Sequence, residues 1–187
     1  MTLHFDDLDA LTRLLALDEL WQDGIAGRLY RSPRLTEQGF ADWPGLMQMA
    51  LLDSEPCGLT TALRNGGRMR RTDDQGRRIP RSAARILAEG EFNRYYCRGV
   101  CRRALTEGLR QVEVVRARAS FTPRESSLEV EGLMLDASWL LDDLRRPPGE
   151  AVGAVPGGPG SGITVRIPRH PRIGGGHGRG SRMDRAA

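Results

Sequence analysis

The chain has 187 residues, of which 39% are hydrophobic and 28% are charged, and this composition is typical of one globular domain with some additional length. No stretch approaches the eighteen or more apolar residues of a membrane-spanning helix, and the first residues lack the basic and apolar regions of a secretory signal, so we expect a cytoplasmic protein. All the basic residues are arginine, a bias typical of a GC-rich genome, which excludes chemistry that needs a lysine.

The first 63 residues predict an acidic, helical half of the domain. Leucines recur at helical spacing between residues 8 and 20, after aspartates that favour a helix N-terminus, and Gly24 and Gly27 end this helix. The sequence Trp43-Pro44-Gly45 predicts the start of a second helix, because proline is favoured in a first turn. A third short helix is expected over residues 59–63. Four arginines and ten acidic residues give this half a net charge of −6.

A strongly basic region follows. Residues 64–81, the arginine loop, carry seven arginines around an Asp-Gln-Gly turn, which is typical of a hairpin tip or of a mobile loop. Ser82 is the expected N-cap of a long helix over residues 83–106. Residues 64–110 together hold thirteen arginines and five acidic residues, a net charge of +8.

The period then changes from helical to alternating. Residues 112–117 alternate as in a strand, and residues 128–132 predict a second strand, antiparallel to the first. Asp136 is the expected N-cap of a short helix that closes the domain at Leu144. Residues 147–187 contain eleven glycines and six prolines, which predicts a disordered tail after a single domain of residues 1–146.

These elements define the expected fold class. It is α+β, with a mainly helical N-terminal half, a long basic central helix, a small antiparallel β-hairpin, a short closing helix and a disordered C-terminal tail.

The arginines of the loop and the long helix are the candidate binding residues. Arg94, Arg98 and Arg102 are spaced i, i+4, i+8 and share one helix face, with Tyr95 beside them. Guanidinium groups interleaved with an aromatic ring suit contacts to phosphates and bases. The alternative is that these helix arginines pair with the acidic N-terminal block. The candidate polyanion-binding residues are Arg70, Arg71, Arg77, Arg78, Arg94, Tyr95, Arg98 and Arg102.

The cysteines do not indicate a metal centre. Cys97 and Cys101 lie one turn apart on the long helix, and Cys57 and His4 are the remaining soft or borderline donors of the expected domain. Since no CxxC or HxxxH partner exists, we expect reduced, buried thiols, no metal and no cofactor.

Catalytic chemistry has little support in the sequence. The three histidines, His4, His170 and His177, lie near the two ends of the chain, which disfavours a histidine-activated nucleophile. Glutamates gather around the expected hairpin, but alternating exposed glutamates are normal on a sheet. A tyrosine nucleophile, Tyr95 or Tyr96, clamped by arginines is the other possibility. No residue is assigned as catalytic.

Two functions follow from these patterns. The first is a non-enzymatic binding or structural protein that contacts nucleic acid or an acidic partner through an arginine-rich surface. The alternative is a phosphodiester-processing enzyme, a nuclease or strand transferase, that uses tyrosine or carboxylates with arginine.

Overall fold

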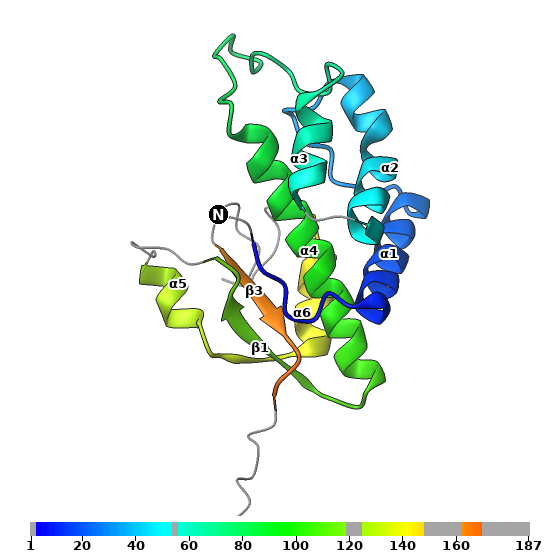
Figure 1. Cartoon of the computed structure of the whole chain (residues 1–187), viewed down its shortest axis with the longest axis vertical. Coiled ribbons are helices and arrows are strands. Elements are labelled where there is room, and N and C mark those ends of the chain that lie inside the picture. The colour runs from blue at the N-terminus through cyan, green and yellow to red at the C-terminus, as the bar shows by residue number, and fades with distance from the viewer. Residues whose placement is uncertain (1–2, 54–55, 119–124, 148–161, 170–187) are drawn as a thin grey trace, which may run out of the picture.

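A computed structural model describes residues 3–53, 56–118, 125–147 and 162–169 of the chain (Figure 1). Over these residues the fold is α+β, with six helices and one three-stranded antiparallel sheet. The elements are α1 (Ala10–Ile25), α2 (Glu37–Asp53), α3 (Pro56–Arg64), α4 (Ala83–Thr106), β1 (Gln111–Arg116), α5 (Glu125–Val130), β2 (Met134–Asp136), α6 (Ala137–Leu144) and β3 (Ile163–Arg166). None of the helices in this part of the chain has the length and apolarity needed to cross a membrane.

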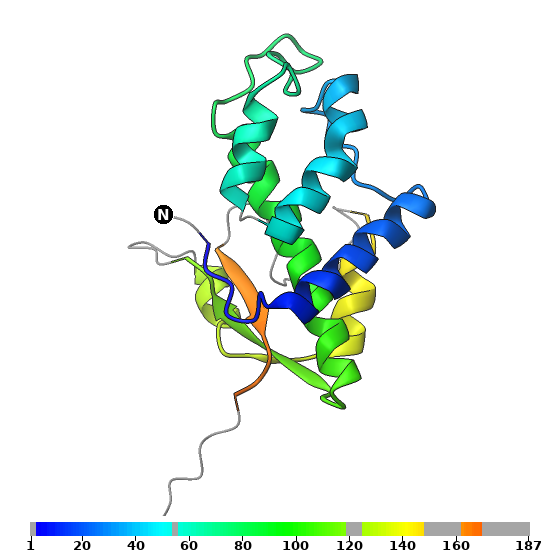
Figure 2. The same cartoon turned by 45° about the vertical axis from the view of Figure 1, so that its right-hand side comes forward.

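Helix α4 is the centre of the molecule. It has the predicted bounds, and α1, α3 and α6 all pack on it, as do β1 and β3 (Figure 2). Along its inner side Phe92, Tyr96 and Val100 are fully buried. The N-terminal segment joins the same core, because the ring centroid of Phe5 lies 5.1 Å from that of Phe92 and 4.6 Å from that of Tyr96.

The ends of the helices correct two sequence expectations. Asp136 caps α6 as predicted, accepting a hydrogen bond of 2.8 Å from the backbone N–H of Trp139. Ser82 precedes α4 but makes no capping hydrogen bond with its side chain. Helix α2 was expected to start near Trp43, but it begins at Glu37. The hydroxyl of Thr36 accepts a hydrogen bond from the N–H of Gly39 and caps the helix at this earlier position. Pro44 therefore lies inside the helix.

The sheet has the order β2-β1-β3, with both pairs antiparallel. The prediction that an antiparallel strand pairs with β1 is confirmed, but its predicted position, residues 128–132, is wrong. Residues 125–130 form helix α5, and the strand that pairs with β1 is β2, where Val112 lies opposite Leu135. The alternation of glutamates with apolar residues covers only five residues, which is too short to separate a strand from a helix.

The domain extends beyond residue 146. Strand β3 lies in the region expected to be a disordered tail, yet Val165 pairs with Val114 of β1, and Ile163 and Val165 are buried in the core. Asn93 of α4 holds this strand, donating a hydrogen bond of 2.9 Å to the carbonyl of Ile163. The expectation is thus wrong for residues 162–169, and residues 148–161 and 170–187 lie outside the described part of the chain.

Candidate polyanion-binding site

The predicted arginine face of α4 points into the molecule. The side chain of Arg98 has no exposed surface, although it was expected to contact a ligand. Its Nε donates a hydrogen bond of 2.9 Å to Glu19, and its two Nη atoms donate to the carboxylate of Asp23. Two acidic residues of α1 therefore neutralise Arg98. This arginine pairs with the acidic N-terminal block, as the alternative interpretation of the helix face predicts.

The arginines on either side of Arg98 are also engaged within the protein. Arg102 pairs with Asp18 and approaches Glu19 to 3.4 Å. The Nε of Arg94 donates a hydrogen bond of 2.8 Å to the carbonyl of Leu144, at the C-terminal end of α6. Each of these arginines fixes one helix to another, because an orphan carbonyl or a carboxylate of the neighbouring helix accepts its hydrogen bonds.

Tyr95 and Tyr96 are equally unavailable. Both side chains are buried, and the hydroxyl of Tyr95 donates a hydrogen bond of 3.1 Å to Asp23. Burial raises the pKa of both phenols well above the ordinary value of a tyrosine. A buried phenol with a raised pKa is a poor nucleophile, so the arrangement does not fit the tyrosine-based enzyme that we considered as the alternative.

Neither the cysteines nor the carboxylates form a metal centre in the residues that the structure describes, where no three His, Cys, Asp or Glu side chains are placed to hold a metal ion. Cys97 and Cys101 are free thiols buried in the core, and burial raises the pKa of Cys97 to about 11. Of the glutamates expected around the hairpin, Glu113 pairs with Arg166 and Glu131 pairs with Arg116. These carboxylates already have cationic partners.

The arginine loop, in contrast, is exposed at one end of the molecule, above the start of α4 in Figure 1. It is docked on the residues that precede α2. The N–H of Thr36 donates to the carbonyl of Arg68 at 3.0 Å, and the N–H of Arg70 donates to that of Arg34 at 2.9 Å. A Cβ atom at Gly39 would lie 2.2 Å from the carbonyl oxygen of Arg68, so only glycine permits this close approach.

The outer half of the loop is an ordered hairpin. The N–H of Ile79 donates to the carbonyl of Arg71, and Thr72 and Arg78 form an antiparallel bridge. At the tip, the carboxylate of Asp73 accepts hydrogen bonds from the backbone N–H groups of residues 75 and 77, both at 2.9 Å. Of the two alternatives that the sequence left open for this turn, the structure has the hairpin tip, and the aspartate supplies its internal support.

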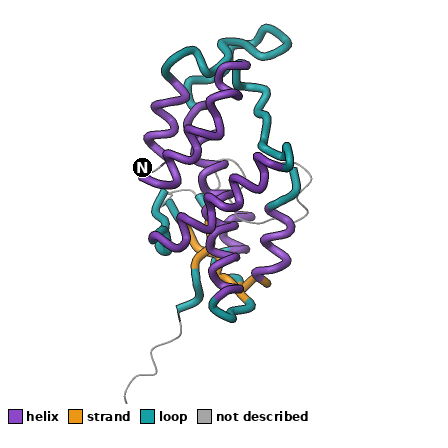
Figure 3. The backbone as a smooth tube through the Cα atoms, turned by 90° about the vertical axis from the view of Figure 1, so that its right-hand side faces the viewer, coloured by secondary structure: helices purple, strands orange, loops and turns teal. Residues whose placement is uncertain are grey.

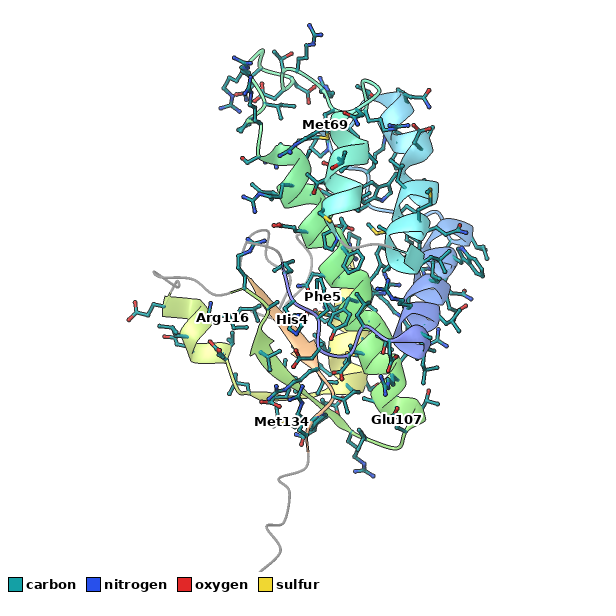
Figure 4. All side chains as sticks on the ribbon, in the orientation of Figure 1. His4, Phe5, Met69, Glu107, Arg116 and Met134 are labelled. Atoms are coloured by element: carbon teal, nitrogen blue, oxygen red, sulfur yellow. The ribbon has the colours of Figure 1, made fainter. Side chains whose placement is uncertain are left out.

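The charges of the loop divide into two groups. Arg68, Arg70 and Arg77 pair with Asp42, Asp74 and Asp73. The second group has exposed side chains and makes no ion pair within the described residues; it consists of Arg64, Arg71, Arg78 and Arg81, together with Arg34 beside the loop. Figure 4 shows nitrogen-tipped side chains projecting from this end of the molecule. We call these five residues the free arginine cluster.

The structure thus divides the eight predicted binding residues. Arg71 and Arg78 belong to the free arginine cluster, and Arg70 and Arg77 lie beside them in ion pairs. The four residues from α4 form internal contacts instead. Sequence reasoning did not include Arg34, Arg64 and Arg81 among the candidate binding residues. The excess of seven arginines over two aspartates in residues 64–81 pointed to Arg64 and Arg81, whereas nothing in the sequence placed Arg34 beside the loop.

Comparisons with known proteins add no relative. The chain matches no protein-family model, no curated protein and no solved structure.

Proposed function

We propose that this protein binds nucleic acid through its arginine loop and acts as a non-enzymatic binding protein. The observation that carries the proposal is a contrast between two sets of arginines. All five arginines of α4 have carboxylate partners, whereas the free arginine cluster has none among the described residues. An exposed guanidinium without a carboxylate partner is available to a phosphate, which it binds in a bidentate geometry.

The form of the loop supports the same proposal. Its backbone is held at the base by residues 34–36 and at the tip by Asp73. Arginines on a preformed hairpin lose less conformational entropy on binding than arginines on an unstructured chain. Arg71 and Arg78 lie on opposite arms of this hairpin, so their charges are presented together.

The chemistry of the loop favours the phosphate backbone of a duplex as the ligand. Residues 64–81 include no phenylalanine, tyrosine or tryptophan, so the loop offers no ring on which an unpaired base could stack. Phosphate contacts position a protein without reading sequence. We therefore expect affinity for duplex nucleic acid with little sequence preference and a steep dependence on salt.

The test is an electrophoretic mobility shift with duplex DNA and duplex RNA across a salt series. Wild-type protein is expected to shift both, and Arg71→Ser/Arg78→Ser is expected to lower affinity about tenfold or more at low salt and to reduce the log–log salt slope by about 2. Arg110→Ser is the matched control. Arg110 is also an exposed arginine, but it lies just after α4, near Glu107, at the opposite end of the molecule from the arginine loop (Figure 4).

Two results would contradict the proposal. One is wild-type protein that gives no shift at low salt, and the other is equal loss of affinity in the loop variant and in Arg110→Ser. Binding to an acidic protein surface without any shift of nucleic acid would indicate that the partner of the arginine loop is an acidic protein. Cleavage of the nucleic acid in the same assay would favour the phosphodiester-processing enzyme.

A further inference from the structure

The outer face of α1 is apolar although it faces away from the core. Leu11, Leu14, Trp21 and Ile25 are 44, 61, 53 and 84% exposed. In Figure 1 this helix forms the right-hand edge of the described structure, and Figure 3 shows the molecule from that side. Together with Asp18, the four apolar residues form the outer seam of α1.

The spacing of the outer seam is that of a helix that pairs with another helix. Residues 11, 14, 18, 21 and 25 follow the intervals 3, 4, 3, 4, which is the heptad pattern of a coiled coil. The opposite side of α1 supplies the core with a separate set of buried side chains, including Ala16, Leu17 and Leu20. The helix therefore has two apolar sides, and only one of them has a partner among the described residues.

From these observations we infer that the outer seam is the interface of a symmetric homodimer, in which α1 packs antiparallel to the α1 of a second copy. The four apolar side chains expose on the order of 500 Å², at the upper end of what one patch on a monomer usually exposes and close to one partner's share of a small interface. A two-fold dimer is also the commonest symmetric assembly.

The helix dipoles favour a second copy in the antiparallel orientation. Asp9 at the N-terminal end, and Arg28 and Arg31 just beyond the C-terminal end, each have an ion-pair partner within their own chain, namely Arg103, Asp23 and Glu37. The two ends of α1 therefore bring no bare charge to the interface. Antiparallel packing sets the dipoles of the two helices in opposition, whereas parallel packing aligns them.

The middle of the outer seam is compatible with this symmetry. Asp18 lies midway between residues 11 and 25, so an antiparallel two-fold axis passes beside it. Each Asp18 is already paired with Arg102 of its own chain. Two neutral ion pairs rather than two bare carboxylates therefore meet at the axis, and a polar pair in such a position fixes the register of the helices.

Sedimentation velocity over a concentration series tests the interface. Full-length protein is expected to dimerise, and Leu14→Glu/Ile25→Glu is expected to raise the dissociation constant at least about tenfold. Leu128→Glu is the control, because Leu128 of α5 is 54% exposed but lies outside the seam. A monomer at concentrations of about 100 μM, or a dimer that survives the seam substitutions, would overturn the inference.

Disulfide cross-linking tests the orientation independently of those charged variants. In a Cys57→Ser background, Asp18→Cys is expected to form an intermolecular disulfide on oxidation, because the two copies of residue 18 meet at the axis. Leu11→Cys is expected to form none, since its two copies lie about 20 Å apart and a disulfide needs Cα atoms within about 7 Å. Equal cross-linking at both positions indicates parallel helices and would overturn the antiparallel dimer.

Discussion

Two glycines of α4 have the same intrinsic cost in a helix but different surroundings. A Cβ atom at Gly99 would lie 2.7 Å from the carbonyl oxygen of Thr12 and 3.1 Å from the Cβ of Ala16, whereas a Cβ atom at Gly90 would have no neighbour within 4 Å. Gly99 is therefore a point of close approach between α1 and α4. This contact sets how near the acidic side chains of α1 come to Arg98.

The first prediction compares the two glycines. Gly99→Ala is expected to lower the free energy of unfolding by about 1–3 kcal/mol, because the new methyl group forces the two helices apart. Gly90→Ala is expected to raise it by up to about 1 kcal/mol, since alanine is the better helix former and the space is open. Urea unfolding of both variants measures the difference, and equal effects of the two substitutions would refute the close helix crossing.

Glu91 supplies a prediction on pH. It is buried, its Oε2 has no hydrogen-bond partner among the described residues, and the nearest cation, Nη1 of Arg94, is 3.8 Å away. Burial raises the pKa of Glu91 to about 7, against the opposing effects of Arg94 and Arg98. Because the folded state holds the proton more tightly than the unfolded state, this group loses stabilising free energy as the pH rises from about 4.5 through 7.

Glu91→Gln removes that titration. The variant is expected to match wild-type stability near pH 5 and to exceed it at pH 8 by on the order of 1–3 kcal/mol, because a neutral amide avoids the buried charge. Thermal unfolding at the two pH values measures the effect. A variant that is less stable than wild type at pH 8 would show that the ionised carboxylate stabilises the fold.

At the scale of elements, β3 is the least expected part of the fold. Its backbone pairs with β1 over four residues, and Thr164 donates a hydrogen bond of 2.6 Å to Asn93. The same segment is tied to the N-terminus, since the N–H of Ile167 donates to Asp7 at 2.7 Å. Strand β3 thus connects β1, α4 and the N-terminal segment.

Two truncations test this role. A chain that ends at residue 161 is expected to melt at least about 10 °C below a chain that ends at residue 169, because it loses the burial of Ile163 and Val165, each worth about 1.5–3 kcal/mol. The longer truncation product is the matched control, because it keeps β3. Equal melting temperatures would mean that residues 162–169 do not stabilise the domain.

At the scale of the whole molecule, the charge blocks of the sequence meet in the interior. Glu19 of α1 accepts hydrogen bonds from Arg98 of α4 and, at 2.7 Å, from Nη2 of Arg145, which follows α6. Burial alone would raise the pKa of Glu19, but the hydrogen bond from Arg145 and the charge of Arg98 outweigh it and hold the pKa below the usual value. One carboxylate therefore links three parts of the fold.

Replacement of Arg98 tests this network. Arg98→Met is expected to destabilise the protein by about 3 kcal/mol at neutral pH, because it leaves Glu19 and Asp23 buried with fewer cations. The loss is expected to shrink on acidification, since a carboxylate with a lowered pKa stabilises the fold above its unfolded pKa and ceases to do so as it is protonated. Arg103→Met is the control, because the partners of Arg103, Asp9 and Glu107, are both exposed, and about 1 kcal/mol or less is expected. Equal losses would exclude a special role for the buried network.

The sequence by itself determined part of the local structure. The long helix over residues 83–106, the cap at Asp136 and the turn at Asp73 follow from periodicity, capping and turn chemistry, which depend on neighbours along the chain. The composition also located the basic region, and its exposed loop supplies the candidate site.

Only the tertiary structure decided which charges face solvent and which apolar faces are covered. Arg71 and Arg98 are the same residue type in the same basic block, but α1 brings two carboxylates to Arg98 and no described carboxylate pairs with Arg71. Likewise the leucines of α1 form one helical pattern, yet Leu17 lies in the core and Leu14 is exposed. Burial and ion pairing depend on residues distant in sequence, so the pattern along one segment cannot specify them.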